Sequence, residues 1–333
     1  MNKIIILTPI KNEEFILNQF LQISSLIADC IIIIDQNSDD KSVEICNNFP
    51  KVHLIHNYNN YYDEAWRQEL LIETARKLFP NDNRIIFCID ADEIFTSESY
   101  LNYKAWDNIK TLSPGTAIYL EKPDLLPGIN SCIRWHNNYF PIGFIDDNSP
   151  HNGTKIHSQR FPSLGIDKHV YINEIKLMHF AHSRPNVQSA KFRFYSVIEN
   201  IHKTKPIYLR RFAYQSFFND KKFNKDKSIE KVPESWLSTW DSLYINLREI
   251  SDIEYSWHDF DVLKKFKNYG TARFYFDNIW NFDWEKCRKY ALIIGKEAPS
   301  YPIAKPPFFY IIFGRLIDLL YIIFNVIRNF RNA

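Results

Sequence analysis

The sequence predicts an α/β fold in which helices flank a mostly parallel sheet, and two observations carry that prediction. Unbroken apolar runs such as Ile4–Leu7 and Ile31–Ile34 are typical of strands buried on both faces of a parallel sheet. Segments with the helical spacing of apolar residues alternate with these runs. Alternation of this kind is typical of a doubly wound domain with right-handed crossovers.

The elements follow one another in the order that such a fold needs. The strand at residues 4–7 precedes an amphipathic helix between Phe15 and Ile27, and the strand at 31–34 follows that helix. A third strand is expected at 52–55, a long helix at about 63–78, and a fourth strand at 85–89. We therefore expect four parallel strands in this part of the chain.

The chain changes character at Pro114. From there to about Met178 it is rich in Pro, Gly, Asn and His and predicts short aromatic strands. From Ser189 to about Lys296 the pattern is mainly helical. The sequence thus predicts a second half of the main domain and then a helical C-terminal extension.

The last segment, residues 305–333, predicts a separate amphipathic helix. Polar residues fall on one side of it, namely Gly314, Arg315, Asp318, Asn325, Arg328 and Asn329. Large apolar residues fill most of the other side, while Arg328 and Arg331 make its end basic. These interruptions disfavour a spanning helix and favour one that lies in a membrane surface with anionic lipid. A buried terminal helix or a dimer contact is the alternative.

Composition narrows the function classes. A formal net charge of +2 argues against a nucleic-acid-binding protein. The 5 cysteines have no CxxC spacing, and the sequence starts with too short an apolar run for a signal peptide. We expect reduced thiols in a cytoplasmic protein.

Polar clusters follow three of the expected strands, as "TPIKNEE", "DQNSDD" and "DADE". In a sheet of this kind ligands bind beyond the carboxyl ends of the strands, so these clusters should meet at one edge. Asp90 and Asp92 are two residues apart and could face one site, where unpaired carboxylates require a positive partner. Mg²⁺ or Mn²⁺ suits such oxygen ligands. The alternative is a capping cluster, in which Asp92 or Glu93 binds backbone N–H groups.

The stretches "IIILTPIKNEEFIL", "IIIIDQNSDDKS" and "IIFCIDADEIF" together resemble the family-2 type of glycosyltransferase, which has the GT-A fold. The resemblance covers residues 3–96 in order and spacing, and extends more loosely to about 195. It implies a GT-A, Rossmann-like domain at 1–235, with a nucleotide-binding half at 1–113 and an acceptor half at 114–235. A helical extension at 236–304 and the amphipathic helix at 305–333 would complete the chain.

The resemblance also implies roles for particular residues. Those that match positions binding the nucleotide sugar are Thr8, Pro9, Glu13, Asp35, Ser38, Arg67, Asp90 and Ala91. Asp92 matches the direct metal ligand, Asp90 the residue near ribose and metal, and Glu93 extends the motif as support. Asp40 completes the turn after Asp35, where Asn37 replaces the usual glycine. Asn tolerates a positive φ, so that turn can form.

A later basic segment, "KLMHFAHSRPNVQSAKFRF", carries further candidates. His179 follows an apolar strand and resembles an additional metal ligand in GT-A enzymes, with a core histidine as the alternative. Arg184 and Lys191 would hold the diphosphate, or would be solvated surface charges.

The implied reaction is the attack of an acceptor hydroxyl on the anomeric carbon of a nucleotide sugar, usually with inversion. The catalytic base is expected in the middle region, where Asp146, Asp147, Asp167 and Glu174 compete; Asp147 is favoured because "FIDDNSPHNG" suggests an acceptor-side loop. With the terminal helix, the acceptor would be a glycan or lipid-linked glycan at the inner face of the cell membrane, as in surface polysaccharide assembly. The alternatives are a non-catalytic nucleotide-sugar-binding or scaffold protein and a nucleotidyltransferase. The absence of glycine in "TPIKNEE" disfavours the last of these.

Overall fold

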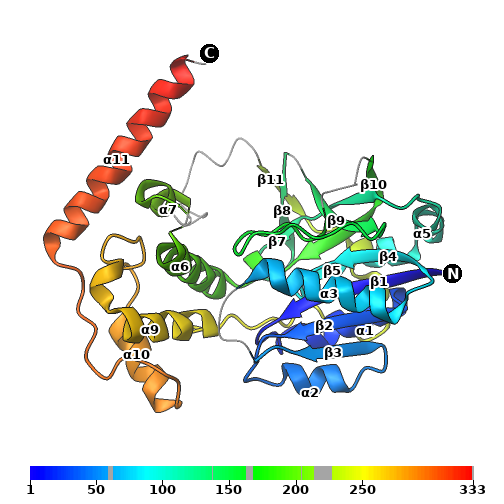
Figure 1. Ribbon diagram of the computed structural model, residues 1–333, viewed down its shortest axis with the longest axis horizontal. Coiled ribbons are helices and arrows are strands. Elements are labelled where there is room, and N and C mark those ends of the chain that lie inside the picture. The colour runs from blue at the N-terminus through cyan, green and yellow to red at the C-terminus, as the bar shows by residue number, and fades with distance from the viewer. Residues whose placement is uncertain (59–62, 137, 163–167, 204, 214–226, 332–333) are drawn as a thin grey trace. The chain divides into compact units, whose positions relative to one another are not determined.

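The protein is described by a computed structural model that covers residues 1–58, 63–136, 138–162, 168–203, 205–213 and 227–331 (Figure 1). The chain divides into two compact units, residues 1–184 with 226–251 and residues 185–225 with 252–333. The domain limits predicted at 235 and 304 do not coincide with this division and remain predictions.

The first half of the sheet is parallel, as predicted. Its strands are β1 (Asn2–Ile10), β2 (Cys30–Asp35), β3 (Val52–His56) and β4 (Asn83–Cys88), in the spatial order β4-β1-β2-β3. The helices between them are α1 (Leu17–Ile27), α2 (Ser42–Asn47) and α3 (Glu64–Leu78). Alternate residues of β1 enter two separate cores: Ile4 and Ile6 pack with α1, while Ile5 and Leu7 pack with α3. Burial on both faces explains why the central parts of β1, β2 and β4 are continuously apolar, whereas the edge strand β3 is half-exposed.

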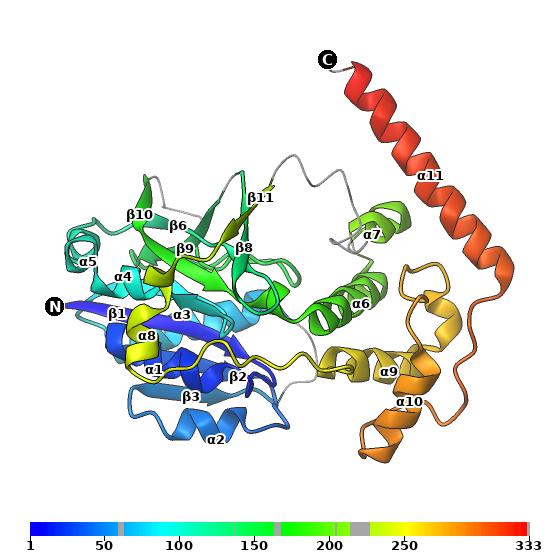
Figure 2. The ribbon, with the colours of Figure 1, turned by 180° about the vertical axis from the view of Figure 1, so that it is seen from behind.

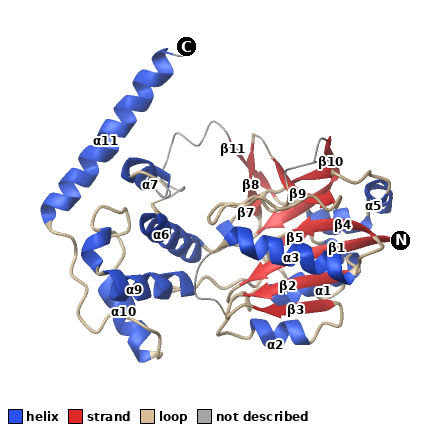
Figure 3. Ribbon diagram, viewed as in Figure 1, coloured by secondary structure: helices blue, strands red, loops and turns tan. Residues whose placement is uncertain are grey.

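The second half of the sheet is mixed (Figure 3). Its strands are β5 (Glu93–Phe95), β6 (Thr116–Glu121), β7 (Asp124–Leu125), β8 (Ser131–Trp135), β9 (Tyr139–Ile145), β10 (Lys168–His179) and β11 (Lys227–Lys231). β9 lies antiparallel between β4 and β6, and β10 continues the sheet parallel to β6. Short helices complete the unit: α4 (Ser97–Leu101), α5 (Tyr103–Lys110) and α8 (Ser238–Ser242). The predicted α/β fold with a large, mostly parallel sheet and flanking helices is confirmed.

The second unit is helical in the part that the structure describes (Figure 2). Its helices are α6 (Pro185–His202), α7 (Ile207–Ala213), α9 (Trp257–Tyr269), α10 (Trp284–Ile293) and α11 (Phe308–Arg331). α6 and α9 are joined by an ion pair of 2.8 Å between Arg193 and the buried Asp259. The predicted helical C-terminal extension is therefore present.

α11 is amphipathic, and its polar side contacts α7. Asp318 accepts hydrogen bonds from Arg211 of α7 at 2.7 and 2.8 Å, and Gly314 is buried against the same guanidinium group. The opposite side exposes a row of large apolar residues, namely Phe308, Phe309, Ile311, Ile312, Phe313, Leu316, Leu319, Leu320, Ile322 and Ile323. The side chains of Asn325, Arg328, Asn329 and Arg331 lie outside the described part. None of the helices in the described ranges is long and apolar enough to cross a membrane.

Candidate active site

The polar ends of β1, β2 and β4 meet at one edge of the sheet, as predicted. Parallel pairing brings the loops after β1 and β2 into contact, where the Asn12 N–H donates to Ser38 Oγ at 2.9 Å and the Glu13 N–H donates to Ser42 Oγ at 2.9 Å. The Ile89 N–H, just after β4, donates to the Leu7 carbonyl at 3.1 Å. This edge is therefore the place where a ligand can reach all three loops.

The turn after β2 has the geometry that the sequence predicted. Asn37 adopts a φ of 56°, in the left-handed region that asparagine tolerates. Asp35 is buried, and its carboxylate accepts the Ser38 N–H at 3.2 Å. Asp40 accepts the N–H groups of Glu14 and Ser42 at 3.0 and 2.9 Å. These contacts fix the turn, and the nucleotide-binding roles of Asp35 and Ser38 remain predictions.

Thr8 and Pro9 lie within β1 rather than in the loop that follows it. The Thr8 hydroxyl is buried and has no hydrogen-bond partner among the described residues. Arg67 lies in the first turns of α3, and its Nε likewise lacks a partner within the described ranges. Buried polar atoms of this kind are costly, so a ligand that satisfied them would gain affinity.

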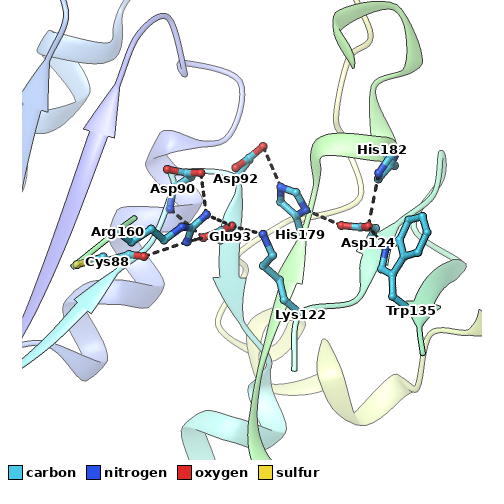
Figure 4. A network of polar contacts seen from close by, with 10 residues as sticks. All are labelled: Cys88, Asp90, Asp92, Glu93, Lys122, Asp124, Trp135, Arg160, His179 and His182. Carbon is cyan, nitrogen blue, oxygen red and sulfur yellow. Dashed lines mark hydrogen bonds and ion pairs between the residues drawn. The ribbon is translucent and has the colours of Figure 1, made fainter. Parts of the chain in front are cut away.

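The "DADE" turn is built around the buried carboxylate of Glu93 (Figure 4). Glu93 accepts the Asp90 N–H at 3.0 Å, Lys122 Nζ at 2.6 Å, and both terminal nitrogens of Arg160 at 2.5 and 2.7 Å. Burial would raise the pKa of Glu93, but the charges of Arg160 and Lys122 hold it well below its usual range. Glu93 is thus an ionised internal support for the turn, and it caps no helix.

Asp90 is held by the same arginine. Arg160 Nη2 lies 3.1 Å from Asp90 Oδ2, and Arg160 Nη1 donates to the Cys88 carbonyl at 2.9 Å. A guanidinium group therefore occupies the position beside Asp90 where the sequence led us to expect a metal or a ribose. The ligand role of Asp90 remains a prediction.

Asp92 and His179 meet because β5 pairs with the end of β10. His179 is the register partner of Glu93, and the Phe180 N–H donates to the Asp92 carbonyl at 2.8 Å. This pairing leaves His179 Nε2 3.7 Å from Asp92 Oδ2. Figure 4 shows the two side chains facing each other across the end of the sheet.

The second nitrogen of His179 faces Asp124, a buried carboxylate at the start of β7. His179 Nδ1 lies 2.5 Å from Asp124 Oδ1, Trp135 Nε1 donates to Asp124 Oδ2 at 2.6 Å, and His182 Nε2 lies 3.5 Å from that oxygen. Burial would raise the pKa of Asp124, but hydrogen bonds from His179 and His182 hold it far below its usual range. A carboxylate–histidine–carboxylate chain therefore runs from Asp124 to Asp92.

The donor set at Asp92 and His179 fits Mg²⁺ or Mn²⁺. One carboxylate oxygen and one imidazole nitrogen face each other, and such cations commonly take few protein ligands and complete their shell with phosphate oxygens and water. Within the described ranges, no group of three or more His, Cys, Asp or Glu side chains is arranged to hold a metal. The residues present thus allow a cation that two side chains and a substrate bind together.

Asp146 and Asp147, which the sequence predicted as catalytic bases, lie at a different edge of the sheet from the site. β9 runs antiparallel to β4, so its end returns to the start of β4, where the Asp146 N–H donates to the Arg84 carbonyl at 2.9 Å. The six residues of β4 put roughly 20 Å between that edge and the "DADE" turn. The Asp146 carboxylate is also fully buried and paired with Arg76 and Arg84 at 2.7 Å each. Both aspartates lie at the opposite edge of the sheet from the site.

The predicted diphosphate contacts lie in different places. Arg184 is buried in the first unit, where its Nε donates to the Ser251 carbonyl at 2.8 Å and its guanidinium group stacks 3.7 Å above the ring of Phe15. Lys191 lies on α6 in the second unit. Their roles remain predictions.

Three residues of the network with charged side chains were not predicted from the sequence: Lys122, Asp124 and Arg160. Lys122 and Asp124 directly follow β6 in "YLEKPD", so the rule that polar strand ends mark a site could have found them. Arg160 lies in an irregular loop after β9 and carries no comparable signal.

The comparisons with known proteins agree with the sequence-based resemblance. Residues 5–102 match the family model described as glycosyl transferase family 2. The matched segment is less than a third of the chain. That segment contains the parallel strands and the "DADE" turn. A search of curated proteins found no match.

Several solved structures show a distant likeness. Glucosyl-3-phosphoglycerate synthase from Mycobacterium tuberculosis, in complex with Mn²⁺, UDP and glucosyl-3-phosphoglycerate, is 15% identical, with 53% of this chain and 71% of that chain covered and a TM-score of 0.33. A putative nucleotide-diphospho-sugar transferase from Desulfovibrio desulfuricans is 11% identical, with 73% and 97% covered and a TM-score of 0.33. A 4-diphosphocytidyl-2C-methyl-D-erythritol synthase is 17% identical, with 45% and 71% covered and a TM-score of 0.29. At these TM-scores the likeness carries no weight for the ligands of this chain.

Proposed function

We propose that this glycosyltransferase moves a sugar from a nucleotide-diphosphate sugar to an acceptor hydroxyl and requires a divalent cation, Mn²⁺ or Mg²⁺. The observation that carries the proposal is the pairing of Asp92 with His179 at 3.7 Å, at the strand edge of a domain that matches family 2. A scaffold that bound no nucleotide sugar would have no need to hold these two side chains on a buried, charged support.

In the proposed reaction the acceptor oxygen forms a bond to the anomeric carbon as the bond from that carbon to the diphosphate breaks, with inversion. Asp92 and His179 would hold the cation, which supplies positive charge where the leaving diphosphate gains negative charge. The buried Thr8 hydroxyl and Arg67 Nε would be satisfied by the nucleotide. The proton of the acceptor hydroxyl would pass to a carboxylate other than Asp146 and Asp147.

We further propose that the acceptor is a glycan or lipid-linked glycan and that the protein acts at the inner face of the cell membrane. The exposed apolar side of α11 supports this proposal, because contiguous apolar patches of this size are rare on soluble monomers. The contact between Asp318 and Arg211 also supports the membrane proposal. This contact occupies the polar side of α11, so the apolar side stays exposed.

The test is a thermal-shift screen of nucleoside diphosphates and nucleotide sugars, each with and without Mn²⁺. A ligand at one hundred times its Kd stabilises the folded protein by about 2.7 kcal/mol. We expect a metal-dependent shift with one nucleotide, lost in Asp92→Ala and kept in the control Asp107→Ala, whose side chain is 71% exposed on α5. If a folded wild-type protein shows no shift with any ligand, the scaffold alternative is favoured.

A further inference from the structure

Asp124 is surrounded by nitrogen atoms that share its two oxygens. Oδ1 faces His179 Nδ1 at 2.5 Å, whereas Oδ2 faces Trp135 Nε1 at 2.6 Å and His182 Nε2 at 3.5 Å (Figure 4). The side chain is only about 9% exposed. A protonated carboxyl would direct its own hydrogen toward one of these groups, so the arrangement suits a carboxylate that only accepts.

The position of the carboxylate determines the tautomer of His179. Because a carboxylate cannot donate, His179 Nδ1 must carry the hydrogen of this 2.5 Å contact. When the ring is neutral, its lone pair therefore lies on Nε2, the nitrogen 3.7 Å from Asp92 Oδ2. We propose that Asp124 is a positioning residue that fixes His179 as the Nδ1–H tautomer and so directs Nε2 toward a divalent cation shared with Asp92. This inference rests on the proposed function.

Trp135 has a specific part in this arrangement. An indole N–H can only donate, so the atom of residue 124 that faces Trp135 must be an acceptor. An asparagine at this position has one oxygen, which Trp135 would take. Its NH₂ group would then face His179 Nδ1, which would have to accept and would move the ring hydrogen to Nε2.

The change Asp124→Asn is therefore expected to reverse the tautomer at nearly constant side-chain volume. Loss of such a supporting carboxylate typically lowers metal affinity about 10- to 100-fold, and we expect a loss in that range for Mn²⁺. Adding Trp135→Phe removes the closer of the two groups at that oxygen, lets the amide oxygen turn to His179 and should recover most of the affinity. Trp135→Phe alone keeps the carboxylate and should change the affinity less than about threefold.

Two measurements test the inference. Imidazole ¹⁵N chemical shifts of ¹⁵N-histidine-labelled, metal-free protein report the tautomer, with His179→Gln to assign the signals. Mn²⁺ titrations followed by electron paramagnetic resonance report the affinity, with the nucleoside diphosphate that gives the metal-dependent thermal shift present. We expect Nδ1–H in the wild type, Nε2–H in Asp124→Asn and Nδ1–H again in the double variant.

Four results would overturn the inference. An unchanged tautomer in Asp124→Asn excludes the positioning role. A loss of affinity in the double variant as large as in Asp124→Asn indicates general damage to the site instead. Equal Mn²⁺ affinity in wild type and Asp124→Asn overturns this inference alone, whereas a wild type that binds no Mn²⁺ overturns the proposed metal-dependent function as well.

Discussion

Asp146 illustrates what a buried carboxylate contributes when two guanidinium groups hold it. Burial would raise its pKa, but hydrogen bonds from Arg76 and Arg84 outweigh burial and keep the pKa below its usual range. The folded-state pKa is thus lower than the value of about 3.9 in an unfolded chain. The stabilisation is complete at a pH above the pKa of the unfolded chain. It is lost as the pH falls through the pKa of the folded protein.

The change Asp146→Asn should lower the free energy of unfolding at pH 7 by about 3 kcal/mol, because it leaves the buried guanidinium group of Arg84 without its charge partner and takes one of two carboxylate partners from the half-buried Arg76. The difference from wild type should shrink as the pH falls below about 4. Urea unfolding across this pH range measures it. The neighbouring Asp147→Asn is the control and should cost little, since Asp147 accepts a hydrogen bond from the Ser149 N–H in a half-buried loop. A pH-independent difference would contradict this electrostatic origin.

At the scale of elements, strand ends and register decide which polar side chains reach the site. Asp92 could be predicted because it follows an apolar run, and the position of His179 follows from the antiparallel pairing of β5 with β10. The direction of β9 could not be predicted, because short aromatic strands in this region give no sign of which neighbour they join. For that reason Asp146 and Asp147 were expected at the wrong edge of the sheet.

Arg160 could not be predicted for a related reason. Its loop returns from the end of β9 to the "DADE" turn and is tied to α3, where Glu64 accepts the Ser158 N–H at 2.8 Å. No periodicity marks such a path, and the loop is fixed by individual hydrogen bonds. Sequence patterns predict regular elements, whereas irregular loops of this length depend on contacts that form only in the folded chain.

The turn after β2 gives a prediction at this scale. Asn37→Val should destabilise the protein by about 1–2 kcal/mol, because a β-branched residue is disfavoured at a φ of 56°. Asn37→Gly should be neutral or slightly stabilising, since glycine adopts this φ without strain. The Tm of each variant measures the effect. Gln36→Val at the adjacent position is the control, and an equal loss there would exclude the backbone explanation.

At the scale of the whole molecule, the candidate active site and α11 belong to different compact units. The first unit holds the charged network at the strand ends, and the second presents the apolar side of α11. The proposed attachment of α11 to a lipid surface would therefore use no residue of the candidate active site.

Binding to a membrane surface is the prediction that follows. The wild type should co-float with vesicles that contain anionic lipid, because burial of each large apolar side chain contributes about 1.5–3 kcal/mol. The side chains of Phe313 and Leu320 are 54% and 57% exposed on one face of α11. A double variant with Phe313→Glu and Leu320→Glu should lower the bound fraction at least about tenfold. Ile293→Glu, on α10 and 82% exposed, should leave it unchanged. The contrary result is a wild type that does not bind vesicles and elutes as a dimer, together with a double variant that elutes as a monomer. In that case α11 is a contact between two copies of the chain.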